Sequence, residues 1–361
     1  MNATTHDKLL ATRLKLLHAA TPRKAPVPIF GCILLEPAEE GVRLTAGDME
    51  HFVQTHTTAI EGVERPVAVQ ADLLHRTLAM IEGDYSLRIE NERLIIETDS
   101  GRYSSITFDG EEYLTHLPSE DFELLFEMDG EEARWLLQGL EHILNEKGYR
   151  EMFRYALLQP QSAGYMAYAT QGQILVAKQI RARIYNPLRF LLPVGIVKLL
   201  RSAIGNDQPV RFGRMGSYLA CEVDGYRFFY RDVELPEIPF EQVLNASQVQ
   251  GKALVPVDAL SASLNRLARF NDQNAVDLEL TSEHLVLRAA DEAEGEARET
   301  LPDVQHEGNA SIRVNARFLL ALLSTLSASH VELRFGQPTQ PLLLTSVEGR
   351  TRAALAPIFK D

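Results

Sequence analysis

The stretch Leu192–Ile204, LPVGIVKLLRSAI, decides the fold, because the chain contains the same pattern three times. In each copy an apolar strand end runs directly into a short amphipathic helix, and a turn and further strands follow it. The other two copies are Val69–Ile81 (VQADLLHRTLAMI) and Val314–Leu326 (VNARFLLALLSTL). One supersecondary unit that recurs at a constant interval is typical of repeated domains.

The intervals between the copies are nearly equal. Gln70, Pro193 and Asn315, the first residues after the apolar strand ends, are 123 and 122 residues apart. A second landmark repeats in the same way, since the first helix of each segment is predicted at Asp7–Ala20, Glu131–Asn145 and Asp258–Phe270. We therefore predict three similar α+β domains, residues 1–124, 125–248 and 249–361, each with two helices on one face of mainly antiparallel strands.

The composition is that of an ordinary globular protein. The chain has 361 residues, of which 45% are hydrophobic and 24% are charged. It contains no apolar run long enough for a membrane span, and MNATTHDKLL at the start does not resemble an export signal. Cys32 and Cys221 lie in apolar runs and are interpreted as buried thiols, which favours a cytoplasmic location. The run Val27–Leu35 predicts a buried strand.

The formal charge of −14 argues against a protein that coats nucleic acid with its whole surface. Basic residues nevertheless occupy the polar faces of the predicted helices: Lys8, Lys15, Arg76, Lys198, Arg201, Arg266, Arg269 and Arg317. Taken singly, each is typical of a solvated helix face. If the helices share one side of the molecule, their cations form a strip that holds phosphates without reading bases.

The sequence contains no recognisable catalytic or metal-binding motif. There is no HExxH, no phosphate-binding glycine loop and no cysteine pair at zinc spacing. Asp48, Glu50 and His51 come nearest to a metal site, but neighbours in a strand diverge, so we interpret them as an exposed turn. Gly213–Gly216 is interpreted as a hairpin turn. We expect no enzymatic activity, no cofactor and no metal.

Several short strings along the chain resemble, in the same order, strings of the bacterial DNA sliding clamp, the beta subunit of DNA polymerase III. They are Val27–Gly31, Leu34-Leu35, Leu44–Glu50, Leu117–Phe122, Arg150, Leu157-Leu158, Ala169–Gly172, Val314-Asn315, Leu319-Leu320 and Ala356–Ile358. Each string alone is weak evidence, whereas their joint order and the matching domain lengths are specific.

The resemblance implies a ring made of two protomers with three domains each, joined head to tail. Such a ring encircles duplex DNA without sequence preference, slides along it, and tethers the polymerase III catalytic subunit, the clamp loader and other proteins that carry a clamp-binding motif. The protein is then a processivity factor without catalytic residues of its own. Leu267 and Phe270 are our predicted apolar residues of the dimer interface.

The resemblance also implies two sets of site residues. A cleft for short hydrophobic peptides comprises Phe153, Thr170, Gly172, Gln173, Ile174, Leu175, Pro239, Val243, Phe318, Ala354, Ala356, Pro357, Ile358 and Phe359. Four residues face the DNA by carry-over, Lys24, Lys147, Arg150 and Arg201, and they join the cations Lys15, Arg76, Lys198, Arg266 and Arg317 of the helix faces.

The chain departs from the family at three places. Gln173-Ile174 replaces a usual His-Arg pair, Pro193-Val194 replaces a basic pair, and the tail ends in Phe359-Lys360-Asp361. These changes affect peptide specificity, DNA grip and the charge beside the cleft. Two alternatives therefore stand beside the clamp: a clamp-fold paralogue that serves as a protein-interaction scaffold with weak or no DNA encirclement, and an unrelated enzyme or scaffold with coincidental repeats.

Overall fold

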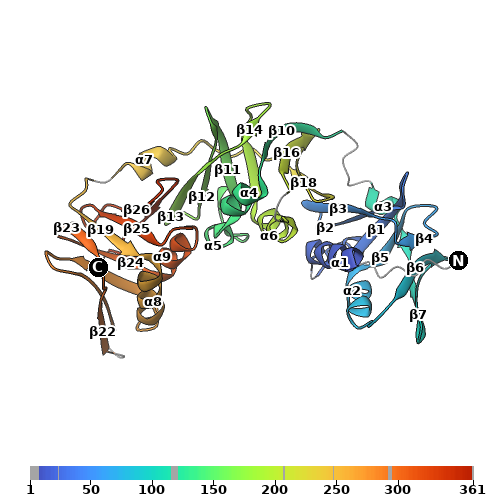
Figure 1. Ribbon diagram of the computed structural model, residues 1–361, viewed down its shortest axis with the longest axis horizontal. Helices are drawn as coiled ribbons and strands as arrows, with labels where there is room; N and C mark the ends of the chain where they lie inside the picture. Colours follow the sequence, from blue (N-terminus) through green and yellow to red (C-terminus); the bar gives the residue numbers. More distant parts are fainter. Residues whose placement is uncertain are drawn as a thin grey trace. The chain divides into compact units, whose positions relative to one another are not determined.

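The computed structural model describes residues 8–22, 24–114, 121–205, 208–246, 248–291 and 295–359, without the side chains of Lys8 and Leu114. The chain divides into two compact units (Figure 1). Unit 1 comprises Met1–Gly130, Ile184–Asn186 and Lys198–Val233, and unit 2 comprises Glu131–Arg183, Pro187–Val197 and Glu234–Asp361. Within the described ranges no helix has the length and apolar character needed to span a membrane.

Unit 1 is built on a ten-stranded sheet in which the strands pair antiparallel. In sheet order the strands are β14 (Arg183–Ile184), β10 (Glu123–Met128), β16 (Val210–Met215), β17 (Tyr218–Val223), β18 (Tyr226–Arg231), β3 (His51–Thr57), β2 (Val42–Gly47), β1 (Cys32–Pro37), β5 (Val67–Gln70) and β9 (Phe108–Asp109). A second sheet has the order β4 (Ile60–Glu61), β6 (Tyr85–Glu90), β7 (Arg93–Thr98) and β8 (Gly101–Ile106), which leaves β8 at an edge.

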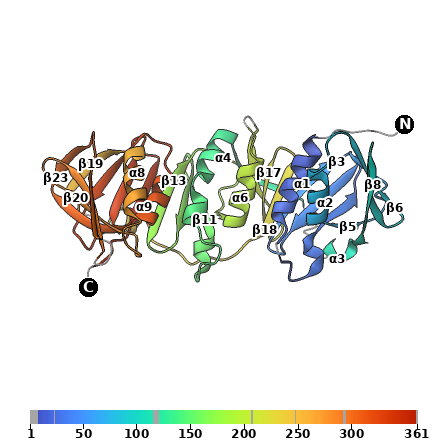
Figure 2. The same ribbon diagram turned by 90° about the horizontal axis from the view of Figure 1, so that it is seen from below.

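Helices cover both faces of the larger sheet in unit 1. The helices α1 (Lys8–Ala20) and α2 (Ala71–Ala79) lie side by side and pack against β1, β2, β3 and β5 (Figure 2). On the other face are α3 (Glu111–Leu114) and the 3-10 helix η1 (Pro28–Gly31). There Tyr113 packs edge-on against Phe30, and Phe52 stacks on Phe229 across the pairing of β3 with β18.

Unit 2 repeats this plan. Its larger sheet has the order β15 (Phe190–Pro193), β11 (Tyr155–Gln161), β12 (Gly164–Thr170), β13 (Ile174–Ile180), β27 (Thr351–Leu355), β26 (Leu342–Ser346), β25 (His330–Phe335), β19 (Gly251–Pro256) and β23 (Gln305–Gly308). Its smaller sheet has the order β22 (Gly295–Thr300), β21 (Leu285–Asp291), β20 (Ala275–Leu280) and β24 (Ala310–Asn315).

The helices of unit 2 are α4 (Gly130–Leu137), α5 (Leu140–Ile143), the 3-10 helix η2 (Glu151–Arg154), α7 (Phe240–Leu244), α8 (Val257–Leu267) and α9 (Ala316–Leu323). The helix α9 packs against α8 and against β13 and β27, while α7 packs on the opposite face of β27 (Figure 1). One further helix, α6 (Val194–Ala203), is divided between the two units.

Two predicted elements were wrong in detail. The expected helix Glu131–Asn145 is broken into α4 and α5, because Gly139 adopts a φ of 74° in the left-handed region. A Cβ on Gly139 would lie 2.7 Å from the backbone of Ser324, so the close approach of that backbone depends on a glycine. The expected strand Val27–Leu35 begins as η1, which starts at Pro28, and becomes β1 only at Cys32.

The α+β class with mainly antiparallel strands is confirmed, and one hairpin of each larger sheet turns through a residue with a positive φ. The turn between β2 and β3 contains Met49 with φ 81°, and the turn between β12 and β13 contains Gly172 with φ 98°. Each larger sheet joins strands from two predicted segments, since β3 pairs with β18 and β13 pairs with β27. The three-domain division remains a prediction, and Leu117 and Pro118, which open the string Leu117–Phe122 just before the first predicted boundary, lie outside the described residues.

Candidate functional site

Predicted cleft positions from distant parts of the sequence meet in unit 2, where the beginning of β13 lies beside the end of β27. Leu175 pairs with Ala354 in the sheet, and Ile174 pairs with Leu355. The backbone N–H of Ala356 donates to the carbonyl of Gln173 at 2.8 Å, so the tail continues the pairing beyond β27. The sheet therefore places the tail next to the turn that precedes β13.

That turn depends on Thr170 and Gly172. The Thr170 hydroxyl donates to the carbonyl of Ile174 at 2.6 Å and accepts from the N–H of Gly172 at 3.0 Å. A Cβ on Gly172 would lie 3.2 Å from Phe153 Cζ, and its φ of 98° also favours glycine. Phe153 is buried and supports the turn. Thr170 and Gly172, which belong to the family-like string Ala169–Gly172, therefore stabilise the backbone of this turn.

On one face of the sheet, α7 packs over β13 and β27. Phe240 and Leu244 of this helix join a buried cluster that contains Leu175 and Ala354, and the ring of Tyr168 stacks on Phe240 at 4.6 Å. Two further cleft positions come from the connector, the segment around α7 that joins the second and third predicted domains. Both stay accessible: Pro239 is exposed, and 40% of Val243 is exposed. Leu175 and Ala354 can form an apolar floor, and Pro239 and Val243 its rim.

A polar cluster ties α7 to the same strands. Glu241 accepts from Arg352 Nη2 at 2.7 Å and from the Tyr168 hydroxyl at 2.9 Å. The hydrogen bond from Arg352 lowers the pKa of Glu241, and burial together with Glu241 raises the pKa of Tyr168 to about 12. These three side chains were not predicted, because their hydrogen bonds join residues 73 and 111 positions apart. They position the connector over the floor.

The opposite face carries the other cleft positions. Phe318, which is half-buried, lies in the first turn of α9, where Asn315 Oδ1 accepts from the N–H groups of Arg317 and Phe318. The tail crosses toward this side, since the N–H of Ile358 donates to the carbonyl of Arg313 at 2.8 Å. At the end of the described tail, 64% of Phe359 is exposed. Lys360 and Asp361 lie outside the described residues.

The structure therefore sorts the fourteen cleft positions by accessibility. Five are buried, so they can only support a cleft from below or form its floor: Phe153, Thr170, Ile174, Leu175 and Ala354. The others are exposed or half-buried: Gly172, Gln173, Pro239, Val243, Phe318, Ala356, Pro357, Ile358 and Phe359. Of the departures from the family, Gln173 is accessible, whereas Ile174, Pro193 and Val194 are buried. Those three positions present no side chain to solvent.

All nine cations predicted to face DNA are exposed: Lys15, Lys24, Arg76, Lys147, Arg150, Lys198, Arg201, Arg266 and Arg317. Two of them are engaged by carboxylates on their own unit. Arg76 lies 2.8 Å from Asp72, and Arg266 lies 2.6 Å from Glu299, whose pKa it lowers through their hydrogen bond. These two positions offer less charge to an incoming phosphate than the sequence suggests.

The nine cations are not all on helices. Lys24 lies between α1 and η1, while Lys147 and Arg150 lie between α5 and η2, where the Arg150 guanidinium is 5.6 Å from the centre of the Tyr149 ring. Arg269, which the helix pattern also singled out, is exposed just beyond α8. The side chain of Lys8 lies outside the described part of the chain.

The two predicted interface residues differ in accessibility. Leu267 is only 1% exposed because it continues the apolar stripe of Leu260 and Leu264 into the core, which leaves it no surface for a partner. Phe270, just after α8, is half-buried. The sequence itself contained this signal, since spacing at i, i+4 and i+7 marks a core-facing stripe.

A different apolar surface in unit 1 was not predicted. The exposed side chains of Tyr103 and Ile106 lie on the edge strand β8, and Met80 at the end of α2 is 86% exposed. Between α2 and β8 lies a groove of about 190 Å³, lined among others by Leu73, Thr77 and Tyr103. An edge strand with unpaired backbone groups and exposed apolar side chains is suited to pair with another chain.

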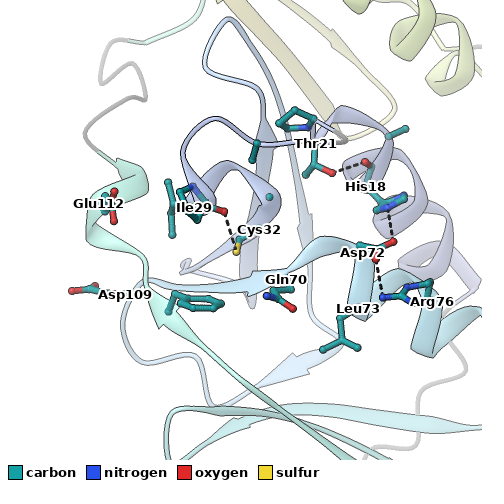
Figure 3. A pocket seen from close by; sticks show the side chains of 16 residues that line it. His18, Thr21, Ile29, Cys32, Gln70, Asp72, Leu73, Arg76, Asp109 and Glu112 are labelled. Atoms are coloured by element: carbon teal, nitrogen blue, oxygen red, sulfur yellow. Dashed lines mark hydrogen bonds and ion pairs between the residues drawn. The ribbon is translucent and has the colours of Figure 1, made fainter.

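A larger hollow of about 1110 Å³ also lies in unit 1 (Figure 3). The ends of α1 and α2 line it with His18, Asp72 and Arg76, and Asp109 and Glu112 line it from the opposite wall. No sequence pattern indicated this hollow, because its walls come from separate helices and loops.

The predicted turn Asp48–His51 is confirmed as a turn. Asp48 Oδ1 accepts from the N–H of His51 at 2.8 Å and from that of Glu50 at 3.2 Å, which closes the backbone around Met49. Gly213–Gly216 belongs to the hairpin of β16 and β17, as predicted. Among the residues that the structure describes, no group of three or more His, Cys, Asp and Glu side chains is arranged to hold a metal ion.

Comparison with known proteins finds similarity to bacterial beta sliding clamps. Residues 246–357 match the family model described as the C-terminal domain of the DNA polymerase III beta subunit. The beta sliding clamp of Proteus mirabilis is 24% identical over 358 residues, and 91% of each chain is covered. That of Pseudomonas aeruginosa is 22% identical over 350 residues, with 92% of each chain covered.

Solved structures show the same fold along the chain. The beta subunit from DNA polymerase of Streptococcus pyogenes superimposes with a TM-score of 0.88 at 15% identity, covering 98% of both chains. The DNA polymerase sliding clamp of Bacillus subtilis gives a TM-score of 0.87 at 16% identity, covering 98% of this chain and 97% of that one.

Proposed function

This chain is a distant homologue of the bacterial beta sliding clamp, the non-catalytic processivity subunit of DNA polymerase III, along nearly its whole length, and from this premise we propose how it works. Two copies close into a ring around duplex DNA in the cytoplasm. The ring slides and tethers the polymerase catalytic subunit and other motif-bearing proteins, and a clamp loader opens it. Tethering raises the partner's effective concentration at the template.

The observation that carries this proposal is the similarity to beta sliding clamps over more than nine-tenths of the chain, in sequence and in fold. The site geometry supports it independently. Residues predicted for one cleft come from β12, the connector, α9 and the tail, and in unit 2 they lie around the joined ends of β13 and β27.

DNA binding in this proposal depends on exposed cations. Lys15, Lys24, Lys147, Arg150 and Arg317 are exposed and provide charges for phosphates, while Arg76 and Arg266 are partly neutralised by Asp72 and Glu299. Binding of this kind is independent of base sequence and falls steeply with salt, because each phosphate contact releases counterions. A weak grip suits a ring that must slide.

Peptide binding in this proposal uses the floor of Leu175 and Ala354. A leucine or phenylalanine of a linear motif packs onto this floor beside the connector residues Pro239 and Val243, and the rest of the peptide crosses the tail toward Ile358 on the opposite face. Gln173, which stands at the place of a basic family residue, offers an amide to the peptide instead of a charge.

Ring closure in this proposal joins the two edge strands of different copies. Strand β8 of one copy pairs with β22 of the other, since each lies at the edge of its four-stranded sheet. Phe270 of the second copy fills the groove lined by Leu73, Thr77 and Tyr103. The head-to-tail direction follows because β8 belongs to unit 1 and β22 to unit 2.

Topology provides the decisive test of encirclement. The protein is loaded with a bacterial clamp loader on nicked circular DNA, washed at high salt, and the circle is then linearised. A ring that encircles DNA stays on the circle and slides off the linear form. Equal loss from both forms would contradict encirclement and would favour the scaffold paralogue, whose specific support is the neutralisation of Arg76 and Arg266.

The cleft is tested with Ile358→Asp. A carboxylate in the tail part of the predicted cleft should reduce binding of a fluorescent clamp-motif peptide by roughly 30-fold or more, as loss of a central interface contact does. Val347→Asp is the matched control, since Val347 is a 62% exposed aliphatic residue in the turn between β26 and β27. Equal peptide affinity of both variants would show that the cleft is assigned wrongly.

A further inference from the structure

Two histidines form a stacked pair between α1 and α2 of unit 1. The rings of His18 and His75 are parallel within 5°, with centroids 4.4 Å apart. His18 Nε2 lies 3.6 Å from Asp72 Oδ1, and the other oxygen of Asp72 lies 2.8 Å from Arg76 (Figure 3). The pair therefore sits in a small charged cluster at the surface where the two helices meet.

The charged groups around the pair come from both helices and from the hollow beside them. Lys15 precedes His18 by three residues on α1, so the two lie on neighbouring positions of one helix face. Asp109 and Glu112 line the opposite wall of the hollow that His18 also lines. Burial, followed by the charges of His18 and Lys15, lowers the pKa of His75, and Asp72 acts in the opposite direction. Two protonated rings at this separation repel one another unless an anion joins them.

We propose that Lys15, His18, His75 and Arg76 form a phosphate site on the helix pair, which holds a backbone phosphate of duplex DNA and gains a proton when it does so. The inference rests on the proposed function, because it needs the helix pair to face DNA. Lys15 and Arg76 are exposed beside the stacked rings, and Asp72 is a single carboxylate shared by His18 and Arg76. A phosphate placed beside the rings supplies the second negative charge that two protonated histidines need.

The direction of the pH effect follows from linkage. A phosphate stabilises the protonated imidazole, so DNA-bound protein holds more protons than free protein. Affinity for DNA then rises as the pH falls through the range in which histidine titrates, about pH 8 to about pH 5.5. One fully coupled proton changes affinity by at most about tenfold per pH unit.

The test compares a double variant with a matched single variant. The affinity of the full chain for a short fluorescent duplex is measured at constant low salt across this pH range for the wild type, His18→Gln/His75→Gln and His284→Gln. His284 is an exposed histidine beside Glu283 in a hairpin turn, so His284→Gln controls for general loss of a histidine. We expect affinity to rise several-fold toward low pH in the wild type and in His284→Gln, and to rise much less in the double variant.

Each outcome has a separate meaning. A pH response of the double variant equal to that of the wild type would overturn the phosphate site while leaving the clamp function intact. No duplex binding by any variant at any pH would also overturn the phosphate site, whereas the proposed function itself fails only if the loaded protein is lost equally from circular and linear DNA. Circular dichroism at each pH completes the test, because affinity that falls together with helix content at low pH would mean that protonation only separates α1 from α2.

Discussion

At the scale of single residues, Lys178 shows how unit 2 handles a buried charge. Its side chain is fully buried on β13, and Nζ donates to the carbonyls of Trp135 at 2.7 Å and Gln138 at 2.8 Å, at the end of α4. A cation at a helix C-terminus satisfies carbonyls that lack intrahelical partners. Trp135, the single tryptophan of the chain, contacts both cations: Lys178 Nζ lies 5.0 Å and the Arg350 guanidinium 4.1 Å from the centre of its ring.

Lys178→Met should therefore destabilise the protein by about 2 kcal/mol, because the carbonyls that Lys178 satisfies lose their partner in a buried place. Urea unfolding followed by Trp135 fluorescence measures the change. Lys252→Met is the control: Lys252 forms a solvent-exposed ion pair with Glu307, and its loss should leave the urea midpoint almost unchanged. Equal destabilisation of the two variants would contradict the role given to Lys178.

The lowered pKa of Glu241 predicts that the stability of the folded protein depends on pH. Because its pKa is lowered in the folded protein, mainly by the hydrogen bond from Arg352, Glu241 contributes stability above the usual carboxyl pKa of 4.5. That contribution disappears as the pH falls through the lowered value. The difference in urea midpoint between the wild type and Glu241→Gln should be full near neutral pH and vanish in acid. A difference that does not change with pH would contradict this assignment.

At the scale of elements, Gly139 separates a predicted helix into α4 and α5. Its left-handed φ of 74° and the backbone of Ser324 beside it leave no room for a side chain. The side chain of Gln138 continues this junction, since Nε2 donates to the carbonyl of Leu326 at 3.0 Å. The break thus lets α5 approach α9, with which it packs.

Gly139→Ala should reduce stability more than Gly349→Ala does. Gly349 has a nearly equal φ of 72° but open space around it, so alanine there pays only for the left-handed backbone, about 1 kcal/mol. At Gly139 the contact with Ser324 adds strain, for a total of about 2 to 4 kcal/mol. Thermal unfolding of both variants measures the difference, and equal values would show that the junction adapts without strain.

At the scale of the whole molecule, continuous sheets connect the predicted segments. The pairing of β3 with β18 and of β13 with β27 puts main-chain hydrogen bonds across both segment boundaries, so each unit folds around strands that are distant in sequence. The four-stranded sheets leave β8 and β22 at edges. These edges are where a second copy can continue the same construction.

The dimer proposal predicts the effect of Tyr103→Asp. A carboxylate in the groove beside β8 should weaken self-association by roughly 30-fold or more and shift the mass in solution from near twice 40.4 kDa toward 40.4 kDa. Tyr149→Asp removes an equally large and more exposed tyrosine outside the groove and should leave the mass unchanged. Sedimentation at micromolar concentration distinguishes the two, and a monomeric wild type would contradict ring closure.

The chain's local patterns were sufficient for the class of fold and for the order of its elements. Apolar spacing at i, i+4 and i+7 located α1 and α8 to within a few residues, because a helix that buries one face must repeat at that interval. The ordered strings, including the Thr170–Gly172 turn, were sufficient for the family, because close backbone approaches admit few residue types.

Tertiary structure alone decided which of these residues are accessible and which are paired. Leu267 is core, Arg266 is partly neutralised by Glu299, and Glu241 meets Arg352 and Tyr168, because packing and pairing depend on residues far away in the chain. The stacked histidines likewise come from two helices separated by five strands. The apolar periodicity of each element can be recognised in the sequence, because it is local. Contacts between elements form only when the sheets bring residues that are distant in the chain together.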